Sequence, residues 1–417
     1  MLLFGKGFHS IPFYIFWIIT INGGEIMIIG IPKEIMHGED RVAAIPSTVE
    51  KMVKDGHKVL LEKGAGAGAF FPDEDYAKAG ATILEDVAAL YEKSDVILKV
   101  KEPLFNEKLG KHEVDLMHKG QYLITFIHPA NPVNHQMVKD MTAKGVIALT
   151  LDGVPRISRA QNMDALSSMS TCAGYKGIIL AADVLPKFIP MIVNAATGMM
   201  KPCNALVIGT GVAGLRAVAT AKSLGAKVFS ADLRPDANEQ AASLGAKIVD
   251  TTVPVEIGCD YDEASKKYKA KKLPDEWLEK ERKALAAAVA DADIVFCSAL
   301  LQGKLAPVIV TEEMVKSMRP GSTIVDISID QGGNCAITPF GSVETKHGIV
   351  LQGIKNIPGL LPTSSTLMFA NNIYNLLAYL VKDDKVVLDE NDEIVQGILV
   401  CKDGKLVHAG AREAMGL

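Results

Sequence analysis

The stretch LVIGTGVAG, residues 206–214, joins a short apolar run to a helical run that covers residues 215–224. Its glycines have the GxGxxG spacing. Gly209 permits a tight turn, Gly211 lets a pyrophosphate approach the backbone, and Gly214 permits close packing of the helix on the strand. Free N–H groups at the helix N-terminus add positive potential for the phosphates. This context predicts a dinucleotide-binding strand–turn–helix unit; the alternative is a glycine turn that binds no ligand.

Asp232 is the carboxylate expected to bind the adenosine ribose, because it ends the next apolar run about 20 residues after the glycine turn. A carboxylate at this position accepts hydrogen bonds from the ribose hydroxyls and repels a 2′-phosphate, which favours NAD over NADP. Arg234 lies nearby and weakens that preference. The residues predicted to bind the cofactor are Gly209, Gly211, Val212, Gly214, Asp232, Leu233, Arg234 and Leu300.

Short apolar runs alternate with helical patterns along the chain from Met27 onward. Such alternation predicts mostly parallel sheets with helices on their faces. The expected strands are 27–32, 58–64, 96–102, 122–128 and 146–152, followed by a second series at 204–209, 227–232, 247–251, 293–299, 323–328 and 349–354. Six strands complete a doubly wound dinucleotide domain. The predicted fold class is therefore α/β, with two Rossmann-like doubly wound parallel-sheet domains and a cleft between them.

The C-terminal part of the chain is expected to return to the first domain. Residues 363–381 have the apolar stripe of one helix, and residues 386–408 alternate like a hairpin, with turn signals at 389–391 and 403–404. The first domain is then discontinuous, formed by residues 27–162 and 360–417. Residues 163–359 form the NAD-binding Rossmann domain between these two pieces, and a ligand is expected in the cleft.

Composition excludes several classes of protein. Lys and Arg total 44 against 49 Asp and Glu, a formal net charge of −5, so bulk charge does not indicate a nucleic-acid partner. The six cysteines are scattered without a CxxC pair, which disfavours a disulfide framework or a zinc site and suits a reducing cytoplasm. HExxH, GxSxG and Walker A motifs are missing. We therefore expect no metal.

Residues 1–26 are unlike the rest of the chain. Residues 11–21 read IPFYIFWIITI, about half the roughly 20 residues that a membrane span needs. A signal peptide is a second interpretation, but a small-residue cleavage site is missing. Residues 23–27, GGEIM, are what a purine-rich ribosome-binding site and a start codon give when translated in frame. We therefore expect residues 1–26 to be a start-site artefact or a disordered extension, which leaves no direct membrane span.

The segment PRISRAQNMDALSSMS, residues 155–170, lies just ahead of the nucleotide fold. It is polar and leads into a helix that begins near Asp164, where Asp and Ser can cap. One interpretation is an interdomain linker with a capped helix. The other is a ligand-binding segment, because Arg156, Gln161, Asp164 and Ser167 offer donors and acceptors suited to a carboxamide and a ribose.

This segment, followed by AGYKG at 173–177, resembles the nicotinamide loop of the alanine dehydrogenase/transhydrogenase alpha family. The stretches GTGVAGLRAVATAKSLGAKV, SALLQGK and GGNC are also similar to that family. The resemblance covers the chain from Met27 to about Val381. Within the family it is strongest to the NAD(H)-binding first component of the NAD(P) transhydrogenase alpha subunit, which belongs to a proton-translocating enzyme of the Re/Si-specific type.

The resemblance implies a homodimer that binds NADH beside Arg156, Gln161, Asp164 and Ser167. The hydride would pass to NADP⁺ on a partner, the NADP(H)-binding beta subunit, with Gln161 helping to bring the two nicotinamides together. Such a transfer needs positioning and exclusion of water rather than an acid–base residue. The resemblance further implies a flap that carries Tyr261 or Tyr268, and a membrane subunit that holds the cytoplasmic protein at the inner membrane.

Arg41, Lys101, His128 and Asp330 keep a second function open, because they correspond to functional residues of alanine dehydrogenase, which deaminates alanine to pyruvate. There the Arg and Lys positions would grip the carboxylate, the His would exchange a proton with the substrate, and the Asp would assist. The structural alternative is that Arg41 and Lys101 form interdomain ion pairs and that His128 begins the turn before Pro129. A NAD-sensing subunit without turnover is the third and weakest hypothesis.

Overall fold

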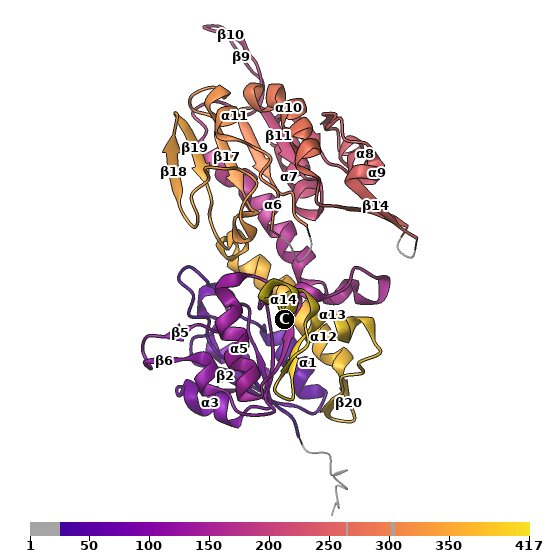
Figure 1. Cartoon of the computed structure of the whole chain (residues 1–417). Coiled ribbons are helices and arrows are strands. Elements are labelled where there is room, and N and C mark those ends of the chain that lie inside the picture. Colours follow the sequence, from indigo (N-terminus) through magenta and orange to yellow (C-terminus); the bar gives the residue numbers. More distant parts are fainter. Residues whose placement is uncertain (1–25, 264–265, 302–304) are drawn as a thin grey trace, which may run out of the picture.

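The computed structural model describes residues 26–263, 266–301 and 305–417. The expected start-site segment lies outside these ranges except for Ile26, as do Gln302, Gly303 and Lys304 of the SALLQGK stretch. The chain forms two α/β lobes, each built around one sheet, as Figure 1 shows. The predicted fold class, two α/β domains with mainly parallel sheets, is thereby confirmed.

The lower lobe in Figure 1 contains an eight-stranded sheet in the order β23-β22-β8-β7-β4-β1-β2-β3. Its central strand β4 (Val96–Leu98) is buried at every residue, as expected for a parallel strand covered on both faces. Strands β22 and β23, from the C-terminal part of the chain, join antiparallel. The other strands are β1 (Ile28–Ile31), β2 (Lys58–Glu62), β3 (Thr82–Leu84), β7 (Tyr122–Thr125), β8 (Ile147–Thr150), β22 (Leu399–Lys402) and β23 (Lys405–Leu406).

The upper lobe contains a seven-stranded sheet in the order β13-β12-β11-β16-β17-β19-β18. The strand order reverses at β11: the chain continues from β11 to β12 and β13 on one side and then returns to β16 on the other side. The crevice at the carboxyl ends of the strands at such a reversal is the expected ligand site. The strands are β11 (Asn204–Ile208), β12 (Lys227–Ala231), β13 (Lys247–Ile248), β16 (Ile294–Cys297), β17 (Thr323–Asp326), β18 (Val343–Lys346) and β19 (Ile349–Gln352). The sequence predicted six of them and missed the antiparallel edge strand β18.

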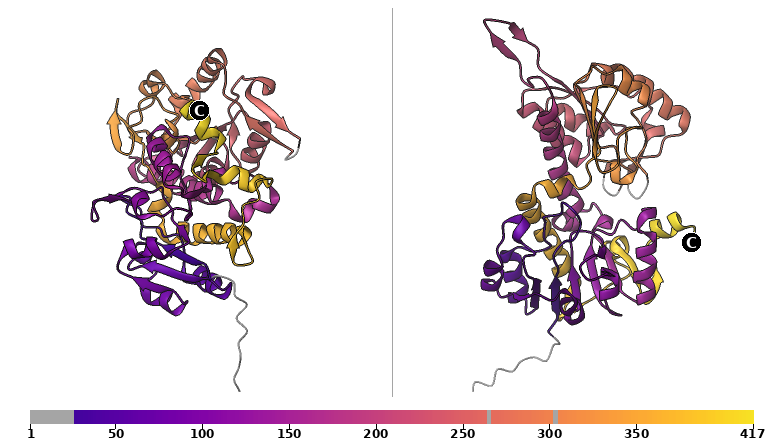
Figure 2. Two further views of the ribbon diagram at one scale, coloured as in Figure 1. Left: turned by 60° about the horizontal axis from the view of Figure 1, so that its bottom comes forward. Right: turned by 90° about the vertical axis from the view of Figure 1, so that its left-hand side faces the viewer.

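Helices cover the faces of both sheets (Figures 1 and 2). Those of the lower lobe are α1 (Pro46–Lys54), α2 (Asp73–Lys78), α3 (Val87–Lys93), α4 (Glu113–Leu116), α5 (His135–Lys144), α13 (Glu393–Ile398) and α14 (Ala409–Met415). Those of the upper lobe are α7 (Val212–Ser223), α8 (Pro235–Ser243), α9 (Val255–Gly258), α10 (Asp275–Asp291) and α11 (Glu312–Ser317).

One long helix, α6 (Ala165–Val184), runs through both lobes, and a second, α12 (Pro362–Leu380), packs against it in the lower lobe. The first half of α6 contributes Met169 to the core of the lower lobe, and its second half contributes Ile178 to the core of the upper lobe. Helix α12 matches the predicted apolar stripe, with Ile373 and Leu377 buried in the lower core. The position of the glycine turn relative to the lower lobe therefore depends on a continuous helix rather than on a loop.

The predicted C-terminal hairpin is wrong in its first half. Asp392 caps the helix α13 at the place where the alternation predicted a strand, and Ile394, Val395 and Ile398 are buried on one helical face. The second turn signal, at 403–404, does join β22 to β23 in a hairpin. Four small hairpins escaped prediction: β5–β6 (Phe105–Asn106, Lys111–His112), β9–β10 (Ile192–Asn194, Gly198–Met200), β14–β15 (Cys259–Asp262, Lys267–Ala270) and β20–β21 (Val381–Lys382, Lys385–Val386).

Candidate functional site

The glycine turn has the backbone that its sequence predicts. Gly209 follows β11 with a positive φ of 83°, and a methyl group there would lie 2.7 Å from the Ala299 nitrogen. A methyl group on Gly214 would lie 2.0 Å from the Gly209 carbonyl oxygen, so only glycine lets α7 pack this close to the turn. For Gly211, the N-cap of α7, the described residues bring only the Arg234 guanidinium near its free face, 3.9 Å from the position of an added methyl carbon. The turn is open at the one glycine where a phosphate would approach.

Asp232 lies directly after β12 and is buried beside the turn. One of its carboxylate oxygens accepts a hydrogen bond from the Thr210 backbone N–H at 2.7 Å. Both oxygens also accept hydrogen bonds from the Arg234 guanidinium, at 2.9 and 2.8 Å. Arg234 thus largely neutralises Asp232, which weakens the electrostatic discrimination against a 2′-phosphate more than proximity in the sequence suggested.

The polar segment ahead of α6 is fixed to the lower lobe through its backbone and through Arg159. The carbonyl of Asn162 accepts hydrogen bonds from the side chains of Asn372 and Asn375 on α12, at 2.9 and 3.0 Å. Arg159 donates to Tyr379 at 2.6 Å and pairs with Asp392 at 2.6 Å. These contacts place a short 3₁₀ helix (Ser158–Met163) at the start of α6.

Within this fixed segment the four predicted residues divide into two pairs. Asp164 is the N-cap of α6, and its carboxylate accepts hydrogen bonds from the Ser167 backbone N–H at 2.8 Å and hydroxyl at 2.5 Å. The predicted cap is therefore confirmed. Arg156 and Gln161 are exposed, and neither side chain forms a hydrogen bond or ion pair with any residue that the structure describes. This second pair is free to contact a ligand.

Two glycines of the AGYKG stretch connect this segment to the glycine turn. A methyl group on Gly174 would lie 2.1 Å from the Ala213 carbonyl oxygen in the first turn of α7, and one on Gly177 would lie 2.6 Å from the Phe296 ring of β16. These contacts let α6 pack directly against the N-terminal end of α7. Ser167 lies seven residues before Gly174 on the same helix, a rise of about 10 Å. Helix α6 therefore holds Ser167 about 10 Å along its axis from the residue that contacts the glycine turn, a separation similar to the length of a nucleoside.

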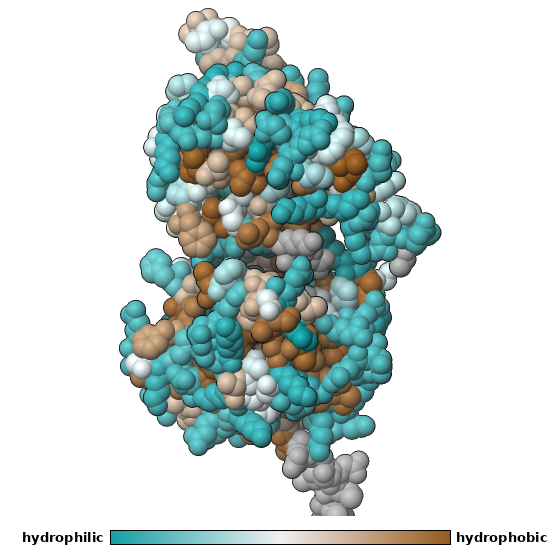
Figure 3. Space-filling view, in the orientation of Figure 1, coloured by the Kyte–Doolittle hydropathy of each residue, from teal (hydrophilic) through white to brown (hydrophobic). Residues whose placement is uncertain are grey.

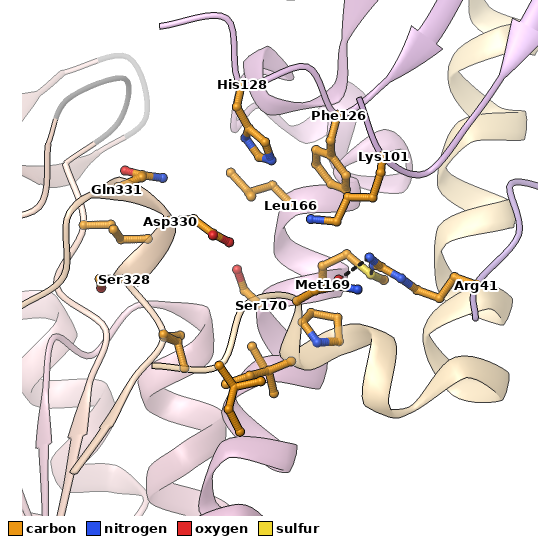
Figure 4. A pocket seen from close by; sticks show the side chains of 17 residues that line it. Arg41, Lys101, Phe126, His128, Leu166, Met169, Ser170, Ser328, Asp330 and Gln331 are labelled. Carbon is orange, nitrogen blue, oxygen red and sulfur yellow. Dashed lines mark hydrogen bonds between the residues drawn. The ribbon is translucent and has the colours of Figure 1, made fainter. Parts of the chain in front are cut away.

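A pocket opens between the lobes at the start of α6, where the surface narrows in the space-filling view (Figure 3). The lower lobe contributes Arg41, Lys101 and His128, and the loop after β17 faces them with Asp330, as Figure 4 shows. The pocket is also lined by Phe126, Leu166, Met169, Ser170, Ala173, Leu300, Ile327, Ser328, Gln331, Ile354, Asn356, Ile357 and Pro358. The structure thus brings together the four residues of the alternative function and Leu300, but Arg156, Gln161, Asp164 and Ser167 are not among the lining residues.

Arg41 is engaged by protein groups on most sides. Its guanidinium forms a two-point ion pair with Glu39, at 2.7 and 2.5 Å, and donates to the Asn356 side chain of the upper lobe at 2.6 Å. Its remaining terminal nitrogen faces the Met169 sulfur. Lys101 is also buried, but no carboxylate of the described residues pairs with it, so the expected ion pair is missing there. Lys101 therefore brings to the pocket a positive charge that forms no direct ion pair with the described residues.

His128 pairs with Asp152, a residue that the sequence did not single out. Its Nδ1 lies 2.7 Å from one Asp152 oxygen, and its backbone N–H donates to the other at 2.7 Å from a left-handed backbone with φ of 49°. Burial disfavours the charged imidazole, but the carboxylate outweighs burial and raises the pKa of His128 above its usual value. Asp330, expected to assist His128, has Lys355 as its ion-pair partner at 4.0 Å instead.

Asp152→Asn should lower the pKa of His128 below the ordinary value for histidine, because burial remains while the attractive charge is removed. NMR titration of the imidazole would measure the change. Asp330→Asn is the matched control and should leave the His128 pKa close to that of the wild-type protein. A larger shift in the control than in Asp152→Asn would contradict this assignment of the partner.

Tyr261 and Tyr268, the two candidates for the tyrosine of the flap, both lie on one hairpin. They pair across β14 (Cys259–Asp262) and β15 (Lys267–Ala270), with ring centroids 5.0 Å apart in an edge-to-face contact. Lys269 and Lys271 form ion pairs with Asp262 and Asp260 of the same hairpin. The positive charges of these two lysines are therefore balanced by carboxylates close to them in the sequence.

Comparison with known proteins places the chain in a family. The family described as "Alanine dehydrogenase/PNT, N-terminal domain" matches residues 30–173, and "Alanine dehydrogenase/PNT, C-terminal domain" matches residues 177–409. The first component of NAD(P) transhydrogenase subunit alpha from Rhodospirillum rubrum is 40% identical over 389 residues, which cover 92% of this chain and 98% of that protein. The alanine dehydrogenase of Bacillus subtilis is 36% identical over 355 residues, which cover 83% of each chain.

A solved structure leads to the same conclusion. The transhydrogenase from Sinorhizobium meliloti matches with a TM-score of 0.77 and 35% identity, over 91% of this chain and all of that one. No helix in the described part of the chain is long and apolar enough to cross a lipid bilayer. The expected resemblance is confirmed: the chain belongs to the alanine dehydrogenase/transhydrogenase alpha family, and the Rhodospirillum rubrum transhydrogenase component matches it at 40% identity against 36% for the Bacillus subtilis alanine dehydrogenase.

Proposed function

We propose that this chain is the NAD(H)-binding subunit of a Re/Si-specific, proton-translocating NAD(P) transhydrogenase. NADH binds along the crevice of the upper sheet, with its pyrophosphate at Gly209, Gly211 and Gly214 and its adenosine ribose at Asp232. The nicotinamide lies beside the segment that carries Arg156, Gln161, Asp164 and Ser167. Hydride passes to NADP⁺ on a beta subunit, and the fixed geometry positions the ring and excludes water.

The observation that carries this proposal is the link between the segment and the glycine turn. Gly174 packs α6 onto the first turn of α7, and α12 holds the segment by its backbone at Asn162. Arg156 and Gln161 are left without partners among the described residues, on the outside of a scaffold that needs neither for its own stability. Such side chains suit contact with a nicotinamide and with a second nucleotide on another subunit.

Gln161→Asn should slow hydride transfer markedly, by about tenfold or more, because shortening the side chain withdraws the amide from the meeting point of the two nicotinamides. NADH affinity should stay nearly unchanged, since Gln161 lies outside the glycine turn and the ribose site. Stopped-flow transfer to NADP⁺ on the beta subunit would give the rate, and NADH fluorescence would give the affinity. Asn162→Asp, which alters the neighbouring side chain, serves as the control. Equal transfer rates for wild type and Gln161→Asn would count against the proposal.

The proposed partners follow from the same assignment. A membrane subunit and the NADP(H)-binding beta subunit would hold this chain at the cytoplasmic face of the inner membrane. The homodimer is supported by the β9–β10 hairpin, which extends away from the upper sheet in Figure 1. Its Val193 and Met199 are 68% and 63% exposed, an unusual position for apolar side chains unless another chain covers them.

The pocket between the lobes favours a second candidate function, NAD-dependent L-alanine dehydrogenase. Lys101 offers an unpaired ammonium group, and His128 with Asp152 offers a proton-transfer pair on the same wall. Arg41 disfavours the dehydrogenase, because its guanidinium already binds Glu39 and Asn356 and so is not free to bind a substrate carboxylate. Incubation with alanine and NAD⁺ separates the candidates: NADH formation would support the dehydrogenase, whereas tight NADH binding without turnover would support the transhydrogenase subunit.

A further inference from the structure

Asn334, in the GGNC stretch, connects two loops of the upper lobe. Its side-chain oxygen accepts the Ala299 backbone N–H at 2.9 Å, and its side-chain nitrogen donates to the Ala299 carbonyl at 2.8 Å. The same nitrogen donates to the Pro307 carbonyl at 2.8 Å, and the oxygen also accepts the Ser328 hydroxyl at 2.9 Å. The amide is fully buried, and every one of its hydrogen-bonding groups is used.

Asp326, at the end of β17, holds Asn334 in place. Its buried carboxylate accepts the backbone N–H groups of Ser328 at 3.0 Å, Asn334 at 2.7 Å and Cys335 at 2.9 Å. These bonds close the loop after β17 onto its own strand. The Asn334 side chain cannot move without breaking bonds in both loops.

Ala299, whose backbone Asn334 holds, forms part of one wall of the crevice. Ala299 packs directly against Gly209, and the Ser298 hydroxyl donates to the Gly209 carbonyl at 2.7 Å. Asp232 follows β12 and Ala299 follows β16, and these two strands lie on opposite sides of β11. A dinucleotide with its adenosine ribose at Asp232 would therefore place its nicotinamide half on the side of Ala299. The next residue, Leu300, lines the pocket between the lobes, as does Ser328 from the second loop.

We infer that Asn334 is a positioning residue for the nicotinamide half of the bound dinucleotide, acting through the backbone of Ala299. The inference rests on the proposed function. Asn334 does not line the pocket, so it touches no ligand there; it sets the position of the wall that does. An amide is required, because the Ala299 backbone presents one donor and one acceptor that must be matched together.

The test compares two ligands, NADH and ADP-ribose, because ADP-ribose lacks the nicotinamide. In Asn334→Asp the new carboxyl group can accept the Ala299 N–H, but when ionised it cannot donate to the carbonyls of Ala299 and Pro307. The affinity ratio of NADH to ADP-ribose should therefore fall about tenfold at pH 8 relative to wild type. Protonation restores one donor, so the ratio should recover toward wild type at pH 6. A defect in folding alone would weaken both ligands equally.

Among the residues that the structure describes, Asp326, Cys297 and Cys335 are the titratable groups packed around this position. Burial raises the pKa of both thiols, so they stay neutral between pH 6 and pH 8. Burial also raises the pKa of Asp326 above its usual value, and its backbone hydrogen bonds oppose that shift. The nearby Asp326 carboxylate and the low-dielectric surroundings both favour the protonated form of a carboxyl group at position 334.

Asn204→Asp is the matched control. Asn204 also donates to a backbone carbonyl, that of Asp291, but at the opposite end of β11. The ratio of NADH affinity to ADP-ribose affinity in Asn204→Asp should equal that of the wild-type protein at pH 6 and at pH 8. Ser328→Ala removes one bond to Asn334 and should lower the ratio by about threefold even if Asn334→Asp folds poorly.

An unchanged affinity ratio in Asn334→Asp at pH 8, or in Ser328→Ala, would overturn the inference while leaving the proposed function in place. Failure of the wild-type chain to bind NADH at all would overturn both.

Discussion

Gly211→Ala is expected to weaken NADH binding by about a hundredfold, or about 2.7 kcal/mol, while leaving the stability of the fold nearly unchanged. The added methyl group meets nothing closer than the Arg234 guanidinium at 3.9 Å, so the apoprotein has room for it. The bound pyrophosphate does not, because the backbone at this glycine is the surface that it approaches. Isothermal titration with NADH and thermal unfolding of the apoprotein would measure the two effects separately.

Gly214→Ala provides the contrast within the same motif. Its methyl group would lie 2.0 Å from the Gly209 carbonyl oxygen, so α7 must shift away from the turn. We expect a loss of about 3 kcal/mol of stability together with the loss of NADH binding. If Gly211→Ala destabilised the apoprotein as much as Gly214→Ala, or bound NADH like wild type, the phosphate site would not lie at this turn.

Lys99→Met is expected to have the largest effect on stability, about 3–5 kcal/mol at pH 8. The Lys99 ammonium is fully buried and forms ion pairs with Glu34 at 3.2 Å and Glu113 at 2.9 Å. Glu34 also accepts the backbone N–H of Val100 at 2.6 Å. Without the lysine, two buried carboxylates face each other with no positive charge between them. Urea unfolding monitored by circular dichroism would measure the loss.

The cost of Lys99→Met should be smaller at pH 6. Burial raises the pKa of Glu34 to about 7 even with the lysine present, and removing the lysine raises it further. A carboxyl group whose pKa is higher in the folded state gains stability as the pH falls below that pKa. Lys101→Met is the control, since Lys101 forms no ion pair with a carboxylate among the described residues, and should cost about 1 kcal/mol at pH 8. Equal costs for the two variants would contradict this account.

The parts of the fold that follow from local pattern were predictable from sequence. The GxGxxG spacing defined the turn between β11 and α7, and the apolar stripe defined α12 within one residue at each end. The hairpin β9–β10 was missed because its apolar side chains Val193 and Met199 stay exposed, so its sequence lacks the alternation of apolar and polar residues that marks a half-buried strand. The helix α13 was missed because six residues are too few to separate the two periodicities.

The residues missed in the site act through contacts between distant segments. Asp152 follows β8 and His128 follows β7, and these strands are neighbours, so their carboxyl ends meet in space. That adjacency was the signal that could have identified the pair, but it required the strand order. The GGNC stretch marked Asn334 as part of the family resemblance, but the sequence did not indicate the role of Asn334 or of Lys99, because a buried amide or ammonium group has the same sequence signature as an exposed one. Only the packing shows the hydrogen bonds of Asn334 and the ion pairs of Lys99.

A reduced nicotinamide is expected to lie between the lobes with its carboxamide beside the segment ahead of α6, and the proposed function depends on this placement. A crystal structure of this chain with bound NADH would test it most directly. The account predicts the pyrophosphate at Gly211 and the carboxamide within hydrogen-bond distance of Arg156, Gln161, Asp164 or Ser167. A nicotinamide bound far from all four, with a small oxo acid between Lys101 and His128, would contradict it and favour the dehydrogenase.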